Sequence, residues 1–430
     1  MRARVTVLAA ALLLTLTTGC GVRDLGPGRV SPSPGGRTTG PPATIAPPTG
    51  HPKTTHPRSS GAGNPSTTGP RGTGQSGATA GALDPARAAL NRMSEAQRIG
   101  QLFMVDCPSA GMTDATASAL RDYRVGSVIL DGNSWDGASA IADITGQLQQ
   151  LASQSNPRGG KLFIATDQEG GQVQRLNGDG FSQLPSALQQ GAIGAAQLTA
   201  QASDWGRQLA AAGVNVNLAP VLDTVPNAAF APQNPPIGAL DRQFGYDPTT
   251  VSAHGVAVTK GLAQAHVAAT LKHFPGLGRV SANTDTTAGV TDTQTTRDDP
   301  YLAPFKAGIA AGAPFVMVST AIYTRIDPSQ PAAFSRTVIT GMLRGDLRFS
   351  GVVISDDLGA AQAVSGYGIG ERAVDFIAAG GDIVLTVDAT QIPAMTAAVA
   401  QRARTDPAFR AQVDSAALRV LEAKAAMGLL

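Results

Sequence analysis

The chain has 430 residues, of which 42% are hydrophobic, 15% are charged and two are cysteines. This length suits one large domain or two ordinary ones, and two cysteines exclude a disulfide framework. The 33 Lys and Arg nearly balance the 31 Asp and Glu, so the chain lacks the strong basic excess typical of nucleic-acid-binding proteins.

The first 20 residues predict a secretion signal with a lipoprotein-type cleavage site. Arg2 and Arg4 precede the apolar run VTVLAAALLLTL, and small residues stand directly before Cys20. The run is shorter than the roughly 20 residues that a membrane-spanning helix needs. In this interpretation Cys20 is acylated and anchors an exported protein at the outer face of the cytoplasmic membrane or in the cell envelope. The alternative is ordinary cleavage, with Cys20 removed or left as a free thiol.

Residues 21–83 predict a disordered tether. This segment is rich in Pro, Gly, Ser and Thr and almost free of large apolar side chains, so it cannot bury enough surface to offset the entropy of the chain. Residues 1–83 hold eight Lys or Arg and one acid, Asp24, which leaves 25 bases and 30 acids in residues 84–430. The mildly acidic remainder therefore gives no indication of nucleic-acid binding.

Eight short apolar runs alternate with helical stretches in residues 84–430, which we interpret as one catalytic domain. The runs cover residues 101–106, 125–130, 161–167, 214–220, 267–274, 315–320, 351–357 and 382–388. Continuous apolar strands that alternate with helices predict a parallel sheet covered on both faces. Eight such units in about 350 residues fit a (β/α)8 barrel, a TIM-type α/β fold.

Helices are also expected outside the eight units. Ser94 and Gln97 have the spacing of a capping box, which predicts a helix before the first strand. After the last run only two helical stretches remain, around 391–403 and 407–427. No second folded domain fits there.

Polar residues at the ends of the runs favour the barrel over a doubly wound open sheet. In a barrel the carboxyl ends of the strands converge on one face, where active sites are built, whereas in an open sheet they spread along an edge. The polar residues at these ends are Asp106, Asp167, Lys272, His273, Ser319, Asp356, Asp357 and Asp388.

The residues expected on this face suit a neutral ligand that carries many hydroxyl groups. Asp167 and Asp356 can accept hydrogen bonds from sugar hydroxyls, and Lys272, Arg175 and Arg242 can donate to them. The sequence offers no Gly-rich phosphate loop, metal-ligand cluster or serine nucleophile elbow. Such a pocket supports cleavage of a glycosidic bond, and neither a metal nor an organic cofactor is expected.

Five segments, in their usual order, resemble the signature segments of glycoside hydrolase family 3. They are MSEAQRIGQLFMV, ATDQEGGQVQRL, NLAPVLD, KHFPGLG and VVISDDLGA, and they are most similar to the single-domain β-N-acetylhexosaminidase branch. The resemblance implies a retaining hydrolase that releases terminal β-linked N-acetylglucosamine from a glycan, with peptidoglycan fragments as the expected source. We expect a monomer that meets the membrane through its lipid anchor alone.

The resemblance assigns the nucleophile to Asp356. Its attack on the anomeric carbon would form a covalent glycosyl-enzyme and retain the configuration of the sugar. The alternative is that Asp356 caps a helix after the strand, although Asp357 is better placed for that.

The resemblance also implies a set of sugar-binding residues. Local alternatives exist: the DQEGG segment fits a strand and a tight turn, Arg242 could pair with Asp241 or Asp247 at the surface, and a lone histidine is often structural. A histidine beside a lysine at a strand end is nevertheless costly to bury without a ligand or ion partner. The residues expected to bind the sugar are Asp167, Arg175, Arg242, Lys272 and His273.

The general acid/base is the point where this sequence departs from the family. Where the resembling enzymes carry Asp-x-His, this chain has Asn283, Thr284 and Asp285. We favour Asp285 itself, which requires burial to raise its pKa when the Gly-rich loop closes. The alternatives are another loop carboxylate such as Asp292, an Asx-turn role for Asp285, or a protein that binds glycans and turns them over poorly.

Other functions remain open at this level. A β-glucosidase or β-xylosidase would use the same residues, and a glycoside phosphorylase would depend less on a strong acid/base. A carbohydrate-binding sensor that has lost turnover belongs to a different class. The intact Asp356 argues against the sensor, because a binding protein does not need that nucleophile.

Overall fold

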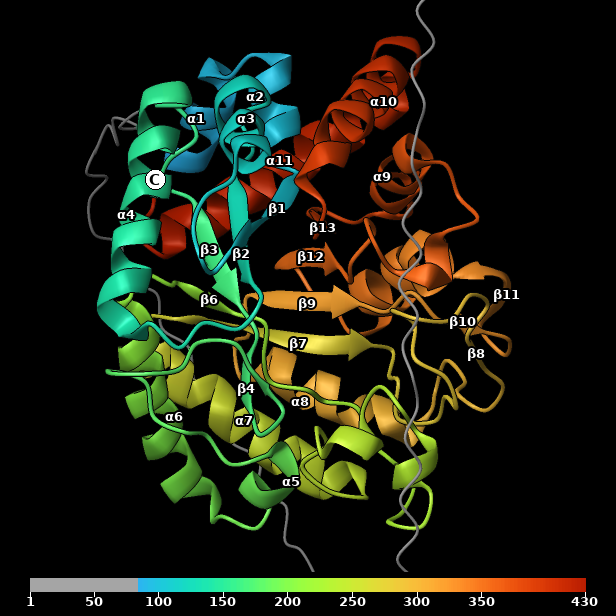
Figure 1. The fold of residues 1–430 in the computed structure, drawn as a ribbon. Coiled ribbons are helices and arrows are strands. Elements are labelled where there is room, and N and C mark those ends of the chain that lie inside the picture. The colour runs from blue at the N-terminus through green and yellow to red at the C-terminus, as the bar shows by residue number, and fades with distance from the viewer. Residues whose placement is uncertain (1–83) are drawn as a thin grey trace, which may run out of the picture. The chain divides into compact units, whose positions relative to one another are not determined.

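The computed structural model describes residues 84–430, so the predicted signal, the tether and Cys20 lie outside the described residues. Eight parallel strands form the centre of the described part, with helices around them (Figure 1). The strands of this sheet are β1 (Phe103–Pro108), β2 (Ser127–Asp131), β3 (Phe163–Thr166), β6 (Val216–Asn217), β7 (Ala268–Phe274), β9 (Phe315–Val318), β12 (Val352–Ser355) and β13 (Val384–Thr386).

The sheet is a nearly closed barrel, which confirms the predicted fold class. Its strand order is β12-β9-β7-β6-β3-β2-β1-β13, so neighbours in the sheet follow one another along the chain except where the last strand, β13, pairs with the first, β1. The two ends meet through a bridge between Ile354 and Ile383, where the amide of Ser355 donates to the carbonyl of Ile383 at 2.9 Å. An open sheet would leave β12 and β13 as separate edges.

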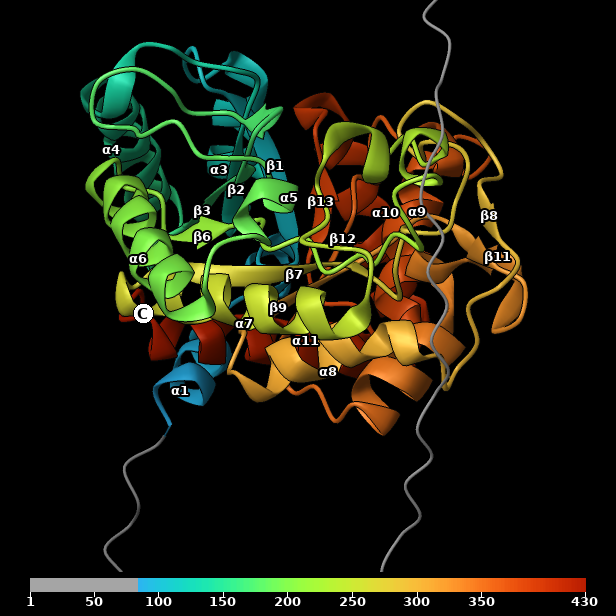
Figure 2. The same ribbon diagram turned by 90° about the horizontal axis from the view of Figure 1, so that it is seen from below.

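Each barrel strand is followed by a helical segment that covers the outside of the barrel. Helices α6, α7 and α8 lie side by side against the β6, β7 and β9 region (Figure 2). The helices are α1 (Pro85–Arg92), α2 (Glu95–Gly100), α3 (Asp114–Asp122), α4 (Gly137–Ser155), α5 (Ala187–Gln190), α6 (Ala195–Ala211), α7 (Pro248–Gln264), α8 (Ala303–Ala310), the π-helix η5 (Thr337–Asp346), α9 (Ile369–Ala379), α10 (Ile392–Thr405) and α11 (Pro407–Ala426).

The expected helix before the first strand is α2, and its capping box is formed. The amide of Gln97 donates to Ser94 Oγ at 3.3 Å, and the amide of Ser94 donates to Gln97 Oε1 at 2.9 Å. The two helices expected after the last strand are α10 and α11. None of the helices within residues 84–430 has the length and apolarity needed to cross a membrane.

Apolar side chains fill the inside of the barrel and also pack between its strands and the surrounding helices. Met104, Phe163, Phe315 and Ile354 belong to the cluster inside the barrel, and each is fully buried. A second, larger cluster lies between the strands and the helices. Because the strands are buried on both faces, their sequences are continuously apolar, which is the pattern that predicted them.

Strand β6 is shorter than its apolar run, because the run ends in a proline. Pro220 has no N–H to donate to the ladder, although its carbonyl still accepts from the amide of Lys272 at 3.2 Å. The chain beyond it rejoins the sheet through a bridge between Val221 and Lys272. The run therefore stays beside β7 and brings its end to the mouth of the barrel.

Two small sheets add to the barrel after its strands. The hairpin of β4 (Gln168–Gly170) and β5 (Val173–Gln174) follows β3 directly. A three-stranded sheet is formed by β8 (Thr291–Asp292), β10 (Ile322–Tyr323) and β11 (Asp327–Pro331), from the segments that follow β7 and β9 (Figure 1).

Candidate active site

The carboxyl ends of the barrel strands surround a cavity of about 340 Å³. This volume lies in the range of small-molecule sites. Apolar side chains from the barrel interior, including Ile129, Met317 and Leu385, form part of its lining. All seven predicted catalytic and sugar-binding residues line this cavity: Asp167, Arg175, Arg242, Lys272, His273, Asp285 and Asp356.

Asp356 directly follows β12. Its amide donates to the carbonyl of Val318 at 2.9 Å, which fixes the backbone against the end of β9, and its Oδ1 accepts from the amide of Asp357 at 3.0 Å. Burial raises the pKa of Asp356 to about 6, and the charge of Asp285 adds to this rise while His273 opposes it. A carboxyl group with a perturbed pKa in a cavity is a candidate functional residue.

Asp357 fixes the turn after Asp356 but does not cap a helix as expected, because the next helical segment begins only at Gln362. Its carboxylate accepts from the amides of Gly359, Ala360 and Ala361 at 2.8 to 3.0 Å and from that of Val387 at 3.0 Å. Because these four bonds hold the backbone, Asp356 is left free to face the cavity.

Lys272 lies at the end of β7 between two carboxylates. Its Nζ is 2.5 Å from Asp167 Oδ1 and 2.6 Å from Glu169 Oε1, and the side chain is 2% exposed. Burial lowers the pKa of Lys272, but the charges of Asp167 and Glu169 outweigh burial and raise it. Lys272 is therefore a fixed cation in the cavity wall.

Arg242 forms a two-pronged ion pair with Glu169 rather than a surface pair with Asp241 or Asp247. Its Nε donates to Oε2 at 2.8 Å and its Nη2 donates to Oε1 at 2.7 Å. Burial opposes the charge of Glu169, but Arg242 and Lys272 together outweigh it and lower the pKa of Glu169 to about 2. Asp247 instead caps α7 by accepting from Thr249 and Thr250.

His273 is held by a buried carboxylate. Its Nδ1 lies 2.7 Å from Asp223 Oδ2, and Asp223 Oδ1 accepts from the amides of His273 at 3.2 Å and Leu277 at 2.7 Å. Since the carboxylate occupies Nδ1, the other ring nitrogen, Nε2, is the one available to a ligand.

Asp167 and Arg175 lie on either side of the β4–β5 hairpin. The tight turn that the DQEGG segment allowed is therefore formed, and both side chains also line the cavity. The amide of Arg175 donates to the carbonyl of Asp167 at 3.2 Å, and its Nη1 donates to Asn133 Oδ1 at 3.2 Å. Gly170 turns the chain with a φ of +111°, and a Cβ there would lie 2.2 Å from the carbonyl oxygen of Pro185. The hairpin therefore depends on glycine at this position.

Asp285 lies in the loop after β7, at the edge of the cavity, and is exposed, so the burial that its expected acid/base role requires is not present in this structure. Its amide donates to Asn283 Oδ1 at 3.0 Å, and its carbonyl accepts from the amide of Gln362 at 3.1 Å. The loop is thus tied to the segment after Asp356. Asp292 is not part of the site, because its buried carboxylate accepts from Gln294 and Thr295 and does not line the cavity.

Sequence reasoning missed Glu169 and Asp223. Glu169 stands two residues after Asp167, and this period-two spacing was the available signal that both could serve one face. Asp223 ends the quoted NLAPVLD segment, one position past the apolar residues. Neither was assigned, because each acts through a neighbouring cation or histidine that only the fold brings close.

A barrel whose mouth combines a buried carboxyl group with fixed cations has the design of a glycoside hydrolase. The family description "Glycosyl hydrolase family 3 N terminal domain" matches residues 95–423, and the chain belongs to this family. Residues 84–430 contain no group of three or more His, Cys, Asp or Glu arranged to hold a metal ion.

Several relatives with assigned names are similar to this chain. A beta-hexosaminidase of Stenotrophomonas maltophilia (strain K279a) is 34% identical over 295 residues, which covers 66% of this chain and 82% of the relative. The crystal structure of the beta-N-acetylhexosaminidase from Beutenbergia cavernae DSM 12333 shares 50% identity with a TM-score of 0.77 and covers 77% of this chain and 99% of that one. A family 3 beta-N-acetylglucosaminidase from Paenibacillus sp. str. FPU-7 shares 31% identity with a TM-score of 0.71, over 78% of this chain and 63% of that one.

Proposed function

We propose that this glycoside hydrolase releases terminal β-linked N-acetylglucosamine with retention, using Asp356 as the nucleophile and Asp285 as the general acid/base. The observation that carries the proposal is the placement of the pair: Asp356, directly after β12, and Asp285, in the loop after β7, line the same cavity. The names of the similar proteins support the N-acetylglucosamine preference.

In the first step a carboxylate oxygen of Asp356 bonds to the anomeric carbon while the glycosidic C–O bond breaks. The Asp285 carboxyl gives its proton to the departing oxygen. In the second step the Asp285 carboxylate removes a proton from water, the water oxygen bonds to the anomeric carbon, and Asp356 leaves. Lys272, Arg242, Asp167, Arg175 and His273 would hold the hydroxyls of the sugar in this position.

The biological setting follows from the N-terminal sequence and the family branch. The peptidoglycan source, the acylated Cys20, the exported location and the monomeric state stay predictions. The residues on which the acylated Cys20 and the exported location depend, up to position 83, lie outside the described part of the chain.

The test uses two β-N-acetylglucosaminides, one with an activated aryl leaving group and one linked to an ordinary sugar alcohol. Asp356→Asn should lower kcat/KM for both by more than about 10³-fold. Asp285→Asn should lower it by about 10² to 10⁴-fold for the poor leaving group and far less for the aryl group, since the latter needs little proton donation.

Asp298→Asn is the matched control, because Asp298 is an exposed carboxylate in the segment that leads to α8 and does not line the cavity. It should leave both substrates unaffected. Equal losses for the two substrates in Asp285→Asn would remove Asp285 from the acid/base role. A wild-type protein that binds the sugar without cleaving the aryl glycoside would favour the sensor.

A further inference from the structure

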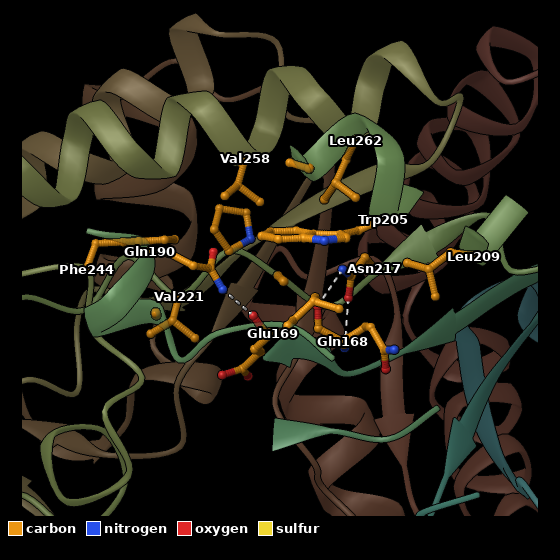
Figure 3. Close-up of a pocket in the computed structure, with 15 residues that line it drawn as sticks. Gln168, Glu169, Gln190, Trp205, Leu209, Asn217, Val221, Phe244, Val258 and Leu262 are labelled. Carbon is orange, nitrogen blue, oxygen red and sulfur yellow. Dashed lines mark hydrogen bonds between the residues drawn. The ribbon is translucent and has the colours of Figure 1, made fainter. Parts of the chain in front are cut away.

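Glu169 lies behind the wall of the sugar cavity, between that cavity and a second void. It does not line the cavity that holds Asp356. Instead it borders an enclosed, mostly apolar void of about 20 Å³ that Trp205, Val221 and Leu262 also line (Figure 3). Glu169 is therefore not placed to contact a sugar in the cavity, yet it binds Lys272 and Arg242, two of the cations that line it.

Glu169 fixes which donors of these cations remain for a ligand. Lys272 has three N–H donors, and two are directed at Asp167 and Glu169. Arg242 has five, of which three are used by the two Glu169 oxygens and the carbonyl of Pro236 at 2.7 Å. One donor of Lys272 and two of Arg242 are left, and the bonds to Glu169 set their directions.

Glu169 also sets the charge of the wall. Lys272 and Arg242 contribute two positive charges, and Asp167 and Glu169 contribute two negative ones, so the four groups are neutral together. A neutral wall suits a neutral sugar. Without the charge of Glu169 this cluster of four would carry one net positive charge beside Arg175, which makes this part of the wall more favourable to small anions, whereas the rest of the cavity is lined by the carboxyl groups of Asp131, Asp285, Asp356 and Asp357.

Side-chain amides form hydrogen bonds with the backbone of Glu169 and of the residue before it (Figure 3). Gln190 Nε2 donates to the carbonyl of Glu169 at 2.8 Å. Asn217 binds the backbone of Gln168, the residue before Glu169. Asn217 Oδ1 accepts from the amide of Gln168, and Asn217 Nδ2 donates to its carbonyl, both at 3.0 Å. These bonds fix the height of β4 at the barrel mouth, and with it the position of the Glu169 carboxylate.

We propose that Glu169 is a positioning residue that aims Lys272 and Arg242 at the hydroxyls of the sugar and keeps the site selective for a neutral sugar over small anions. This inference rests on the proposed function for the identity of the sugar. It does not depend on turnover, because sugar binding alone reports it.

The experiment compares wild type with Glu169→Gln, which keeps the size of the side chain and removes its charge. We measure the dissociation constant of N-acetylglucosamine, KM and kcat for the aryl glycoside, and inhibition by inorganic phosphate. The variant should bind the sugar about 10- to 100-fold more weakly and show a KM raised by a similar factor, because the amide NH2 of Gln cannot accept from the cations and its oxygen no longer carries a negative charge. Phosphate should inhibit it at least about tenfold more strongly than wild type.

Glu169→Asp distinguishes the effect of the charge from the effect of the side-chain length. It also allows the proposal to be tested if Glu169→Gln does not fold. It restores the negative charge on a shorter side chain, so phosphate inhibition should stay at the wild-type level while sugar binding weakens. Strong phosphate inhibition of this variant would contradict the charge argument.

Asp382→Asn is the matched control for the loss of a buried carboxylate. Asp382 is fully buried and pairs with Arg344 at 2.5 Å and Arg419 at 2.7 Å, at the start of β13 and away from the cavity. It should lower the melting temperature and leave sugar binding and phosphate inhibition unchanged. If Glu169→Gln behaves in the same way, Glu169 is only structural and the proposal is wrong. A wild type that binds the sugar without cleaving it would overturn the proposed function and leave this comparison intact.

Discussion

Two buried lysines, Lys272 and Lys424, lie at opposite ends of the barrel and are stabilised in opposite ways. Lys272 ends β7 at the mouth, where two carboxylates face it. Lys424 belongs to α11, is fully buried, and donates to Gln101 Oε1 at 2.8 Å and to the carbonyls of Gly126 and Gly159 at 3.0 and 3.1 Å. These partners precede the first residues of β1, β2 and β3, so Lys424 lies at the floor.

The different surroundings of the two lysines suit different roles: ligand binding for Lys272 and structural support for Lys424. Carboxylates raise the pKa of Lys272 despite its burial, so a permanent cation is available to a ligand at the mouth. Three neutral oxygens accept from the Lys424 Nζ, the Phe163 ring centroid lies 5.4 Å from it, and burial lowers its pKa to about 7. The floor lysine joins a helix to three strand starts, in keeping with the division of barrels into a catalytic face and a stability face.

The largest expected effect is on activity and belongs to the mouth alone. Lys272→Met should lower kcat/KM for the aryl N-acetylglucosaminide by about 10² to 10³-fold, because a preorganised donor to the sugar is lost. Lys424→Met should leave kcat/KM within about twofold of wild type. The measurement is steady-state kinetics on both variants at a temperature at which both are folded.

The two lysines would not differ in the proposed way if Lys424→Met lost as much activity as Lys272→Met. That outcome would mean that the contacts of Lys424 at the floor determine the positions of the residues at the mouth. Circular dichroism on both variants distinguishes it from simple unfolding.

The second expected effect is on stability and belongs to the floor. The pKa of Lys424 is about 7 in the folded state and about 10.4 in an unfolded chain. Between these values the unfolded chain holds a proton that the folded one lacks, so stability rises with pH in this window. Below pH 7 both states are protonated and this contribution is lost.

Relative to Lys424→Met, wild type should therefore gain roughly 1 kcal/mol of unfolding free energy per pH unit from pH 7 to pH 9. Urea unfolding at pH 6, 7, 8 and 9 measures the difference, in which other titrating groups cancel. Parallel curves for the two proteins would show that the three oxygen acceptors keep Lys424 charged.

The barrel and its mouth were predictable, because both depend on local patterns. Burial on two faces makes each strand a continuous apolar run, and the polar residue at the end of a run points to the mouth. This is why Asp167, Lys272, His273 and Asp356 were placed on one face from sequence alone. The open sheet could be disfavoured but not excluded, because closure depends on the contact of β12 with β13.

Residues that act through tertiary partners were not predictable in the same way. Glu169 stands in a segment that also fits a plain tight turn, and its role appears only when β7 and the loop before α7 bring Lys272 and Arg242 to it. Lys424 lies in an Ala-rich helix where a lysine normally faces solvent. Its burial follows from the packing of α11 beneath the barrel, which no local pattern encodes.

The smallest expected effect is a shift in the pH profile at the mouth. As the proposed nucleophile Asp356 must be ionised, and its pKa is raised to about 6, so kcat/KM for the aryl glycoside should fall about tenfold per pH unit below pH 6. Asp285→Asn removes one of the charges that raise this pKa, and the acid limb should move to lower pH by less than about one unit.

The matched profile of Asp298→Asn should coincide with that of wild type. An acid limb that stays in place would mean that burial alone sets the pKa of Asp356, and one that moves to higher pH would contradict the charge interaction between the two carboxylates.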